Sequence, residues 1–369
     1  MRVVILSFSH VLERRGGAEN QCDIISRELY KLGFDVSYIF VSDECNTSIY
    51  KGVKLFPIKR KNKIIPGKNH YQYFIPVLKK LKQIKPEVIY IRNLNALIGI
   101  AAFFKIFNKT KIALHIASAA DLNKLKYKLI SPYFLSLLFN NLLKKIGINL
   151  TDIIFGQEKW HIDRFKELYG EKNFSFLRVN KLYELKLSTD AKRDDNHKNI
   201  VWIGNIKPVK RIDLLFDLAE EIANEKVVIN VIGRIDYNGL ERKDYLKKLN
   251  SYDNIKYHGN LEYNTVLKIL SEAHCLVHTS DYEGGAPMVF LESWSLFTPV
   301  ISLNINPDNI FKNFENCFSD GNFNDFVEDV KKMLFNNELR VKNGEIGNEI
   351  VKNSFSTNNI HDMISFFRP

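Results

Sequence analysis

Two glutamates, Glu283 and Glu292, flank a glycine-rich loop in the last third of this 369-residue chain. Gly284-Gly285-Ala286 forms the loop, and its small side chains let backbone N–H groups approach a ligand closely. Pro287 suits the first position of a following helix, whose N-terminus attracts anions. Carboxylates accept hydrogen bonds from hydroxyls. An anion and a polyol held together indicate a nucleotide or a nucleotide sugar as ligand.

Other candidate residues follow predicted strands elsewhere in the chain. Gly16 and Gly17 come after a strand at 2–9, His115 lies in a strand at 111–117, and Lys207, Lys210 and Arg211 follow a strand at 199–204. Each has an ordinary structural explanation as well. A glycine pair is often only a tight turn, a histidine in an apolar strand is often a core residue, and lysines after a strand often form a solvated face.

The elements that must position these residues alternate between strands and helices. Strands are predicted at 2–9, 35–41, 87–93, 111–117, 152–157 and 174–180, and then again at 199–204, 227–233, 275–280 and from 299, with helices between them. Residues 42–70 are predicted to be irregular. This alternation is typical of doubly wound α/β domains, which bind ligands at the carboxyl ends of their parallel strands.

Two such domains are predicted, with all the candidate residues facing one central cleft. An N-terminal Rossmann-like, acceptor-binding domain covers 1–182, a polar linker covers 183–198, and a C-terminal Rossmann-like, nucleotide-sugar-binding domain covers 199–352. The last segment, 353–369, is predicted to form a helix with one apolar face, made of Ile360, Met363, Ile364 and Phe367.

The net charge of +11 is unevenly distributed along the chain. Residues 1–150 carry 25 Lys and Arg against 9 Asp and Glu, whereas residues 151–369 carry 28 against 33. The basic half has two explanations, general solubility or an anionic partner such as membrane headgroups or a phosphorylated acceptor. Nucleic acid is not expected, because no recognition helix or RNP-like aromatic motif accompanies the basic residues.

Targeting and redox features indicate the cytoplasm. The four cysteines are scattered, with no CxxC pair, which fits a reducing compartment. No signal peptide is expected, and the apolar run at 129–143 is too short and too polar to span a bilayer. We therefore expect a cytoplasmic protein that binds the inner face of the membrane peripherally, through the basic residues 59–63 and the Lys- and aromatic-rich stretch 122–146.

Five segments in order resemble the retaining GT-B glycosyltransferases of family 4. They are GGAEN at 16–20, LHIASAAD at 114–121, GQEKW at 156–160, WIGNIKPVKRIDLL at 202–215 and SDYEGGAPMVFLESWSLFTPVIS at 280–302. The resemblance spans most of the chain, and the last segment is the most specific. It implies a GT-B fold whose C-terminal helix crosses back to the N-terminal domain.

The resemblance also implies roles for single residues. Glu283 would bind the hydroxyls of the donor sugar, Glu292 the ribose, Lys210 the diphosphate, and His115 the donor sugar. The family's arginine after the glycine is Asn205 here, so Lys207, Arg211 or Arg234 would have to compensate. The loop between the two glutamates is one residue longer than in the family, and its glycines would absorb that residue. The full donor-side set is Gly17, Gly204, Asn205, Lys207, Lys210, Arg211, Gly233, Arg234, Gly284, Gly285, Ala286, Pro287, Met288 and Glu292, and the acceptor-side candidates are Gly16, Gly17 and Asp121.

The implied reaction is sugar transfer with retention from a UDP- or GDP-sugar to a lipid-linked or polysaccharide acceptor. No metal or other cofactor is expected, because the chain has no DxD motif in a suitable loop, and cationic side chains with a helix dipole would neutralise the leaving diphosphate. Two alternatives remain. One is a nucleotide-sugar epimerase of the same fold, and the other is a catalytically impaired nucleotide-sugar or glycan-binding protein, which Asn205 favours.

Overall fold

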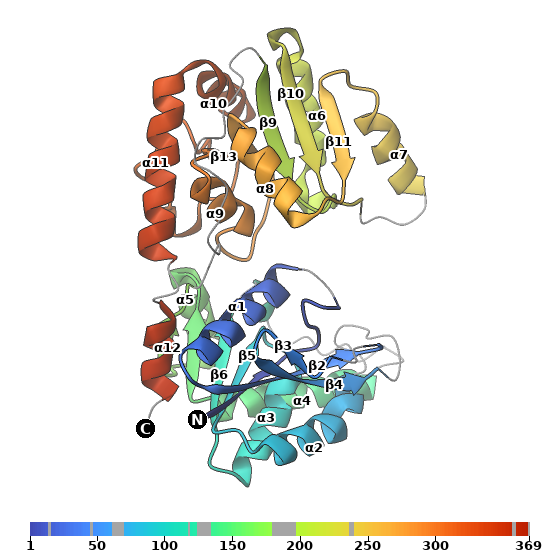
Figure 1. Ribbon diagram of the computed structural model, residues 1–369, viewed down its shortest axis with the longest axis vertical. Helices are drawn as coiled ribbons and strands as arrows, with labels where there is room; N and C mark the ends of the chain where they lie inside the picture. Colours follow the sequence, from blue (N-terminus) through green and yellow to red (C-terminus); the bar gives the residue numbers. More distant parts are fainter. Residues whose placement is uncertain are drawn as a thin grey trace. The chain divides into compact units, whose positions relative to one another are not determined.

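The computed structural model describes residues 1–13, 16–44, 47–60, 70–116, 119–123, 134–178, 197–235, 240–355 and 359–367. The chain divides into two compact units, one made of residues 1–181 and 356–369, the other of residues 182–355 (Figure 1). Each unit has its own sheet and its own hydrophobic core. Among the described residues, no helix is both long enough and apolar enough to cross a membrane.

The N-terminal unit contains an eight-stranded sheet in the order β3-β4-β2-β1-β5-β6-β7-β8. All strand pairs are parallel except the β3–β4 hairpin. Its strands are β1 (Arg2–Leu6), β2 (Asp35–Ser42), β3 (Ile49–Tyr50), β4 (Val53–Lys59), β5 (Val88–Arg92), β6 (Lys111–Ile116), β7 (Ile153–Gly156) and β8 (Phe174–Phe176). Its helices are α1 (Gly17–Lys31), α2 (Phe74–Ile84), α3 (Leu97–Ile106), α4 (Phe134–Leu150), α5 (Lys159–Tyr169) and α12 (Asn359–Phe367).

Helices cover both faces of this sheet, so its central strands are apolar on both sides. Every residue of β5 is buried, which is typical of a parallel strand packed between two helical layers. Helices α2, α3 and α4 pack side by side on one face (Figure 1), where they enclose the core with Val4, Leu6 and Ile89. Helix α1 packs against the opposite face, with Cys22, Ile25 and Leu29 buried.

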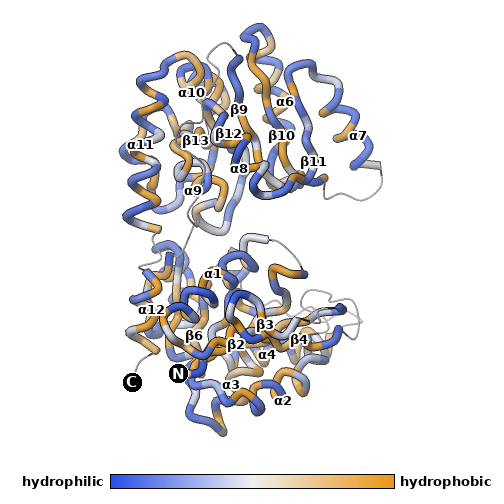
Figure 2. Tube along the Cα trace, viewed as in Figure 1, coloured by the Kyte–Doolittle hydropathy of each residue, from blue (hydrophilic) through white to orange (hydrophobic). Residues whose placement is uncertain are grey.

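The C-terminal unit contains a five-stranded, all-parallel sheet in the order β11-β10-β9-β12-β13. Its strands are β9 (Lys198–Ile203), β10 (Val227–Ile232), β11 (Ile255–Gly259), β12 (Cys275–His278) and β13 (Val300–Ser302). Its helices are α6 (Ile212–Glu221), α7 (Leu240–Leu249), α8 (Tyr263–Glu272), α9 (Met288–Ser295), α10 (Phe323–Phe335) and α11 (Asn337–Ser354). The alternating blue and orange segments of Figure 2 follow this layering, because helices such as α6, α8 and α10 turn one apolar face inward.

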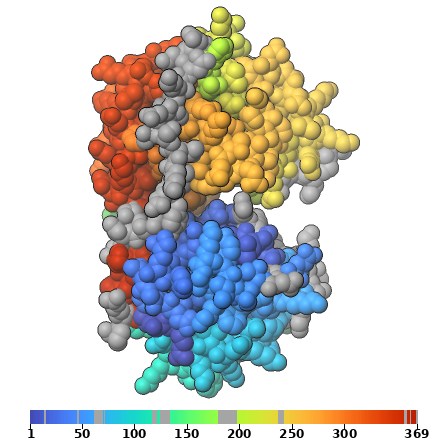
Figure 3. Space-filling view, viewed as in Figure 1, coloured from blue at the N-terminus to red at the C-terminus, as the bar shows by residue number. Residues whose placement is uncertain are grey.

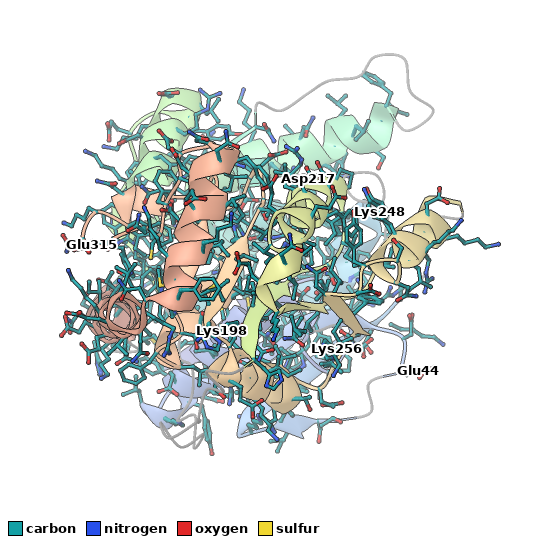
Figure 4. All side chains as sticks on the ribbon, turned by 90° about the horizontal axis from the view of Figure 1, so that it is seen from above. Glu44, Lys198, Asp217, Lys248, Lys256 and Glu315 are labelled. Atoms are coloured by element: carbon teal, nitrogen blue, oxygen red, sulfur yellow. The ribbon has the colours of Figure 1, made fainter. Side chains whose placement is uncertain are left out.

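Aromatic contacts stabilise the edge of this unit near α6 and α7. The ring of Tyr252 stacks on Phe216 with centroids 5.5 Å apart. Lys248, which Figure 4 labels beside Asp217, places its ammonium group 4.6 Å from the centroid of Phe216. A cation over an aromatic face contributes about 0.5–1 kcal/mol at an exposed site. These contacts join α7 and the turn after it to α6.

These features confirm the predicted doubly wound α/β fold and correct some of its details. The stretch 42–70 is not wholly irregular, because its described part contains β3 and β4. The predicted helix at 353–369 corresponds to α12, Asn359–Phe367, while Asn353 and Ser354 belong to α11. Its predicted apolar face is confirmed, because Ile360, Met363, Ile364 and Phe367 are all buried. Most of the predicted linker, residues 183–196, lies outside the described residues.

The last helix belongs to the N-terminal unit, as predicted. Helix α12 contacts α1, and the ammonium group of Lys111 in β6 donates a 2.9 Å hydrogen bond to the carbonyl of Phe366. The side chain of Asn359 donates to the carbonyl of Arg178 at 2.7 Å. The chain therefore returns to its first unit after completing the second.

Candidate nucleotide-binding site and the polar edge of each unit

Two loops of the C-terminal unit meet at the carboxyl ends of β9 and β10. The N–H of Gly204 donates to the carbonyl of Ile232 at 3.0 Å, and the N–H of Ile206 donates to the carbonyl of Arg234 at 2.9 Å. Gly233 has a φ of 143°, and a Cβ there would lie 1.9 Å from the carbonyl oxygen of Gly204. Only glycine fits this position. The predicted residues Gly204, Asn205, Lys207, Gly233 and Arg234 therefore lie on two adjacent loops.

Glu283 and Lys210 form an ion pair between the loop after β12 and the short turn after β9. His278, the last residue of β12, lies with its Nε2 3.1 Å from Glu283 Oε1 and 3.2 Å from the hydroxyl of Ser280. Burial alone would raise the pKa of Glu283, but the hydrogen bond from His278 and the charge of Lys210 outweigh it and lower that pKa to about 2. Glu283 is therefore ionised at neutral pH.

Glu292 lies in a very different environment. It is the fifth residue of α9 and is almost completely buried, with the hydroxyl of Tyr263 donating to its Oε1 at 3.1 Å. Burial raises the pKa of Glu292 to about 7, and the bond from Tyr263 offsets only part of that rise. The two predicted carboxylates thus differ by several pKa units because one has cationic and imidazole partners and the other has a phenol.

The glycine loop joins these two carboxylates. Gly285 adopts a φ of 157°, which residues with a Cβ rarely adopt. Helix α9 begins at Met288, so Pro287 is the N-cap residue and not the first helical residue that the sequence suggested. Gly284, Ala286 and Met288 are partly exposed beside it. The irregular backbone lies entirely before the helix, where the extra loop residue was expected.

Arg211, which was expected to compensate for the family arginine that Asn205 replaces, has two acidic partners. The guanidinium of Arg211 binds Asp213 at 2.8 Å and Asp281 at 3.0 Å. The hydrogen bond to Asp213 is the main reason why the pKa of Arg211 is raised. Asn205 is exposed on the loop after β9. Lys207 and Arg234 remain as the other candidates for added positive charge at this edge.

In the N-terminal unit, Gly16 and Gly17 form the start of α1. Gly16 is the N-cap residue, with no side-chain cap, and a Cβ there would lie 2.5 Å from the carboxylate of Glu19. Glu19 also accepts a 2.5 Å hydrogen bond from the hydroxyl of Ser9. The glycine pair therefore forms both a turn and a helix N-terminus, and the carboxylate of Glu19 lies close to Gly16.

His115, whose contact with the donor sugar stays a prediction, has close partners within its own sheet. Its side chain is fully buried, and its Nδ1 lies 2.5 Å from the hydroxyl of Tyr90 and 3.1 Å from Nη1 of Arg92. Burial lowers the pKa of His115 well below its ordinary value, and the charge of Arg92 lowers it further. The ring is neutral and holds its neighbours in place, so we describe His115 as a positioning residue.

Asp121 also has a structural task. Its Oδ1 accepts a 2.8 Å hydrogen bond from the backbone N–H of Leu94, in the loop that follows β5, and its side chain is buried. Asp121 therefore fixes the loop at the end of β5. A direct contact of Asp121 with an acceptor stays a prediction.

Three residues at these edges were not predicted from the sequence: His278, Tyr263 and Arg92. All three lie outside the segments that carry the family resemblance, and His278 lies two residues before one of them. A signal was present for His278 and Arg92, because each is a polar residue near the carboxyl end of an apolar strand, where ligands bind in parallel sheets. Tyr263 had no such signal, since its partner Glu292 is 29 residues away.

No group of three or more His, Cys, Asp or Glu side chains suitable for a metal ion occurs in the part of the chain that the structure describes.

Solved structures with similar folds place the whole chain in a known class. Sucrose-phosphate synthase from Thermosynechococcus elongatus superposes with a TM-score of 0.77, covering 100% of this chain and 98% of that one at 13% identity. HepE from Anabaena, solved in complex with UDP and glucose, superposes with a TM-score of 0.71, covering 99% and 98% of the two chains at 13% identity. The protein therefore has the GT-B fold of glycosyltransferases.

Sequence comparison adds the family. Residues 184–349, which cover most of the C-terminal unit, match the model of the family described as glycosyl transferases group 1. A poly(ribitol-phosphate) α-N-acetylglucosaminyltransferase from Staphylococcus aureus (strain COL) is 25% identical over 182 residues. That alignment spans 48% of this chain and 36% of the relative, so this chain matches only about a third of the relative's length.

Proposed function

We propose that this chain is a retaining glycosyltransferase of family 4 that transfers a sugar from a nucleotide-diphosphate donor, with a UDP-sugar favoured over a GDP-sugar. The observation that carries the proposal is the arrangement of Lys210, Glu283 and Glu292 around a glycine loop and the N-terminus of α9, within the unit that matches the group 1 family model. HepE, which shares the fold, was solved with UDP and glucose.

Each residue then has a chemical task. The ammonium group of Lys210 binds the diphosphate and neutralises its growing charge as the bond to the sugar breaks. Glu283 accepts hydrogen bonds from the sugar hydroxyls, and Glu292 accepts them from the ribose. Donor binding requires Lys210 to exchange its partner Glu283 for the diphosphate. Glu283 keeps its hydrogen bond to His278 during that exchange.

The proposed transfer proceeds with retention and without a metal ion. The acceptor hydroxyl attacks from the face that the diphosphate leaves, through an oxocarbenium-like state, and the leaving phosphate takes its proton. No strong side-chain base is needed for this route. Cationic side chains and the N-terminal dipole of α9 stabilise the leaving group instead.

Nucleotide release distinguishes this proposal from its two rivals. The full chain is incubated with a panel of UDP- and GDP-sugars, with and without lipid-linked or polysaccharide acceptors, and free nucleotide and sugar products are measured. A transferase releases UDP or GDP in step with acceptor modification. An epimerised donor without release would indicate the epimerase, and binding without any product would indicate the impaired binding protein.

For the acceptor, we propose a lipid-linked or polysaccharide substrate in bacterial surface glycan synthesis. The name of the S. aureus relative refers to a poly(ribitol-phosphate), a polymer that contains phosphate groups. The apolar and basic helices of the N-terminal unit also favour an acceptor that is presented at a membrane, and the protein would then be cytoplasmic and peripherally bound.

Helices α2, α3 and α4 form the surface that we propose for this contact. Their exposed apolar side chains include Leu135 at 77%, Phe107 just after α3 at 73% and Ile75 at 59% exposure. Ring contacts join the three helices, because Phe74 lies 5.3 Å from Phe103 and 6.3 Å from Phe139 between ring centroids. The surface of α2 and α3 appears in cyan at one edge of the N-terminal unit in Figure 3. Exposed apolar side chains that gather on neighbouring helices mark an interaction site.

The charge of this surface matches anionic headgroups. The three helices carry no aspartate or glutamate, and their lysines Lys79, Lys82 and Lys145 are exposed, whereas Lys105 pairs with Asp152. Apolar insertion and lysine attraction together give stable membrane binding where either alone is weak. Of the predicted contact residues, 61–63 and 124–133 lie outside the described residues.

Sedimentation with liposomes tests this contact. The wild-type chain should co-sediment with vesicles that contain phosphatidylglycerol and not with neutral phosphatidylcholine vesicles. Replacing Leu135 and Phe107 with Ser should reduce binding about tenfold or more while leaving UDP binding unchanged. Binding that ignores both lipid charge and these substitutions would contradict the proposal, and loss of a dimer on substitution would assign the surface to a second copy of the chain.

A further inference from the structure

A buried arginine without an acidic partner lies at the carboxyl end of β5, in the centre of the N-terminal sheet. Arg92 is the last residue of β5 and is only 7% exposed. Among the described residues no carboxylate lies within ion-pair distance of it, and its Nε has no hydrogen-bond partner. Arginine stays protonated in proteins, so this is a buried positive charge.

The known partners of this guanidinium are neutral. Its Nη1 lies 3.1 Å from Nδ1 of His115. Because a guanidinium can only donate, Nδ1 must accept and cannot carry a proton. The hydroxyl of Tyr90 lies 2.5 Å from the same nitrogen. His115 is therefore a neutral ring that orients Arg92 without compensating its charge.

The turn that follows Arg92 has an unusual backbone and an unpartnered polar atom. Asn93 has a left-handed backbone with a φ of 67°, and its side-chain Oδ1 is buried without a hydrogen-bond partner. Asp121 accepts from the N–H of Leu94 and so fixes this turn. Strained backbone at the end of a strand, held by neighbouring groups, is typical of a binding site.

The place in the fold agrees with this chemistry. Strand β5 pairs with β1 on one side, where Leu6 lies opposite Ile91, and with β6 on the other, where His115 lies opposite Arg92. The carboxyl ends of these three central strands form the edge at which parallel sheets bind ligands. The loop after β1 leads to Gly16, the uncapped N-terminus of α1, on the same edge.

A buried cation with only neutral partners is costly for a protein to keep. The cost is compensated when an anion binds, and a guanidinium favours phosphate oxygens, which it can bind through two parallel hydrogen bonds. Two carboxylates of helix α1 have partners other than Arg92. Glu19 accepts a hydrogen bond from Ser9, and Asp23 pairs with Arg27 at 2.9 Å.

We propose that Arg92, oriented by His115 and Tyr90 and assisted by Asn93, binds a phosphate group of the acceptor substrate. This inference rests on the proposed function, because it names the chemical class of the acceptor. The donor diphosphate has its own cation, Lys210, in the other unit, so the Arg92 site serves a phosphate monoester or diester on the acceptor.

Ligand binding to the full chain tests the proposal, with sn-glycerol 3-phosphate as the probe, glycerol as its neutral counterpart and UDP as the donor-side ligand. The wild-type chain should bind glycerol 3-phosphate and not glycerol. Arg92→Met should lower the affinity for glycerol 3-phosphate at least about tenfold and leave UDP affinity unchanged. Arg92→Lys should give an intermediate loss, because lysine keeps the charge but not the two-pronged geometry.

Arg164→Gln is the matched control, since it removes the same charge from an exposed arginine of the same unit. Arg164→Gln should leave the affinity for both ligands unchanged. A second readout separates binding from a structural role. Without ligand, Arg92→Met should keep or raise the melting temperature, because it removes an uncompensated buried charge.

Three outcomes would overturn the inference. The first is a wild-type chain that binds UDP but not glycerol 3-phosphate. The second is a variant Arg92→Met that melts at a lower temperature yet binds glycerol 3-phosphate as tightly as the wild type, which would make Arg92 structural. The third is a variant that loses UDP affinity instead, which would assign Arg92 to the donor. A chain that binds glycerol 3-phosphate through Arg92 but never binds a nucleotide would contradict the proposed function and leave the phosphate site standing.

Discussion

The cationic side chains at the polar edges of the two units differ in whether they have acidic partners. In the C-terminal unit, Lys210 pairs with Glu283 and Arg211 pairs with Asp213 and Asp281. In the N-terminal unit, Arg92 has only a neutral histidine and a tyrosine beside it. Both edges lie at the carboxyl ends of parallel strands, so the fold alone does not explain the difference.

The difference indicates what each edge has to bind. At the C-terminal edge, a cation must exchange its carboxylate partner for the ligand when the ligand binds. Such an exchange suits a donor that carries both a diphosphate for the cation and sugar hydroxyls for the carboxylate. An edge with an unpaired cation gains charge compensation directly from an anion. The first arrangement favours selectivity for a ligand with both kinds of group, and the second favours affinity for phosphate.

We call the C-terminal edge, where Lys210 pairs with Glu283, the paired edge. The largest effect is expected from removing its cation Lys210. Lys210→Met should lower the transfer rate about 100-fold or more, because the leaving diphosphate loses its neutralising charge. Lys256→Met, which removes an exposed lysine from β11 of the same unit, is the control and should leave the rate unchanged. Initial rates of nucleotide release measure both. A variant Lys210→Met with full activity would remove the lysine from the mechanism.

The next effect concerns the glycine contact that supports the paired edge. Gly233→Ala should lower the free energy of unfolding by about 2–3 kcal/mol, since the new Cβ meets the carbonyl of Gly204 in a backbone conformation that strains any side chain. Gly170→Ala also has a positive φ, but nothing lies within 4 Å of the added Cβ, so it should cost only about 1 kcal/mol. Urea unfolding of both variants checks this, and equal losses would show that the contact does not matter.

A smaller effect is expected at His278, which holds Glu283. His278→Leu should raise the KM for the donor about tenfold, because Glu283 loses a hydrogen bond of about 1.5–3 kcal/mol, whereas His278→Gln should restore part of it through its amide donor. The pH at which activity falls on the acid side should rise in the leucine variant, since the hydrogen bond from His278 helps to lower the pKa of Glu283. An unchanged pH profile would make His278 only a packing residue.

The smallest effect is a dependence of nucleotide affinity on pH. The pKa of Glu292 is raised to about 7, so its carboxyl is partly protonated at pH 6 and ionised at pH 8. Ribose hydroxyls donate best to the ionised form, and UDP affinity should therefore rise a few-fold from pH 6 to pH 8. Glu292→Gln should bind UDP more weakly at pH 8 and lose this added rise, which calorimetry at both pH values can detect.

The same pKa has a consequence for stability, with the opposite sign. A carboxyl whose pKa is raised by folding destabilises the native state as the pH rises from about 4.5, the ordinary value, to about 7. Glu292→Gln should therefore stabilise the free protein at pH 8, by up to about 3 kcal/mol, and have little effect at pH 4. A variant that is destabilised equally at both pH values would indicate that Glu292 has a structural role only.

Much of the fold was predictable because its central strands are continuous apolar runs that alternate with amphipathic helices. Strand β5 and the apolar face of α12 are examples. The hairpin of β3 and β4 was missed because β3 has only two residues, and α10 and α11 were missed because their many polar residues weaken the helical pattern.

The candidate site was predictable where local spacing carries the chemistry, as in the glycine loop between Glu283 and Glu292. It was not predictable where the chemistry depends on contacts between distant segments. Arg211 was expected near a diphosphate, yet Asp281, 70 residues later, helps to bind it. His115 was expected to face the donor, yet its neighbours on β5 bury it against Tyr90 and Arg92. Only the folded sheet reveals which cation is compensated and which is not.

A calorimetric titration of UDP into the full chain tests the central claim, that the paired edge of the C-terminal unit is the nucleotide site. The wild-type chain should bind UDP, Lys210→Met should bind it at least about tenfold more weakly, and Arg92→Met should bind it as the wild type does. A wild-type chain that binds neither UDP nor GDP, or an affinity for UDP that depends on Arg92 and not on Lys210, would contradict the account.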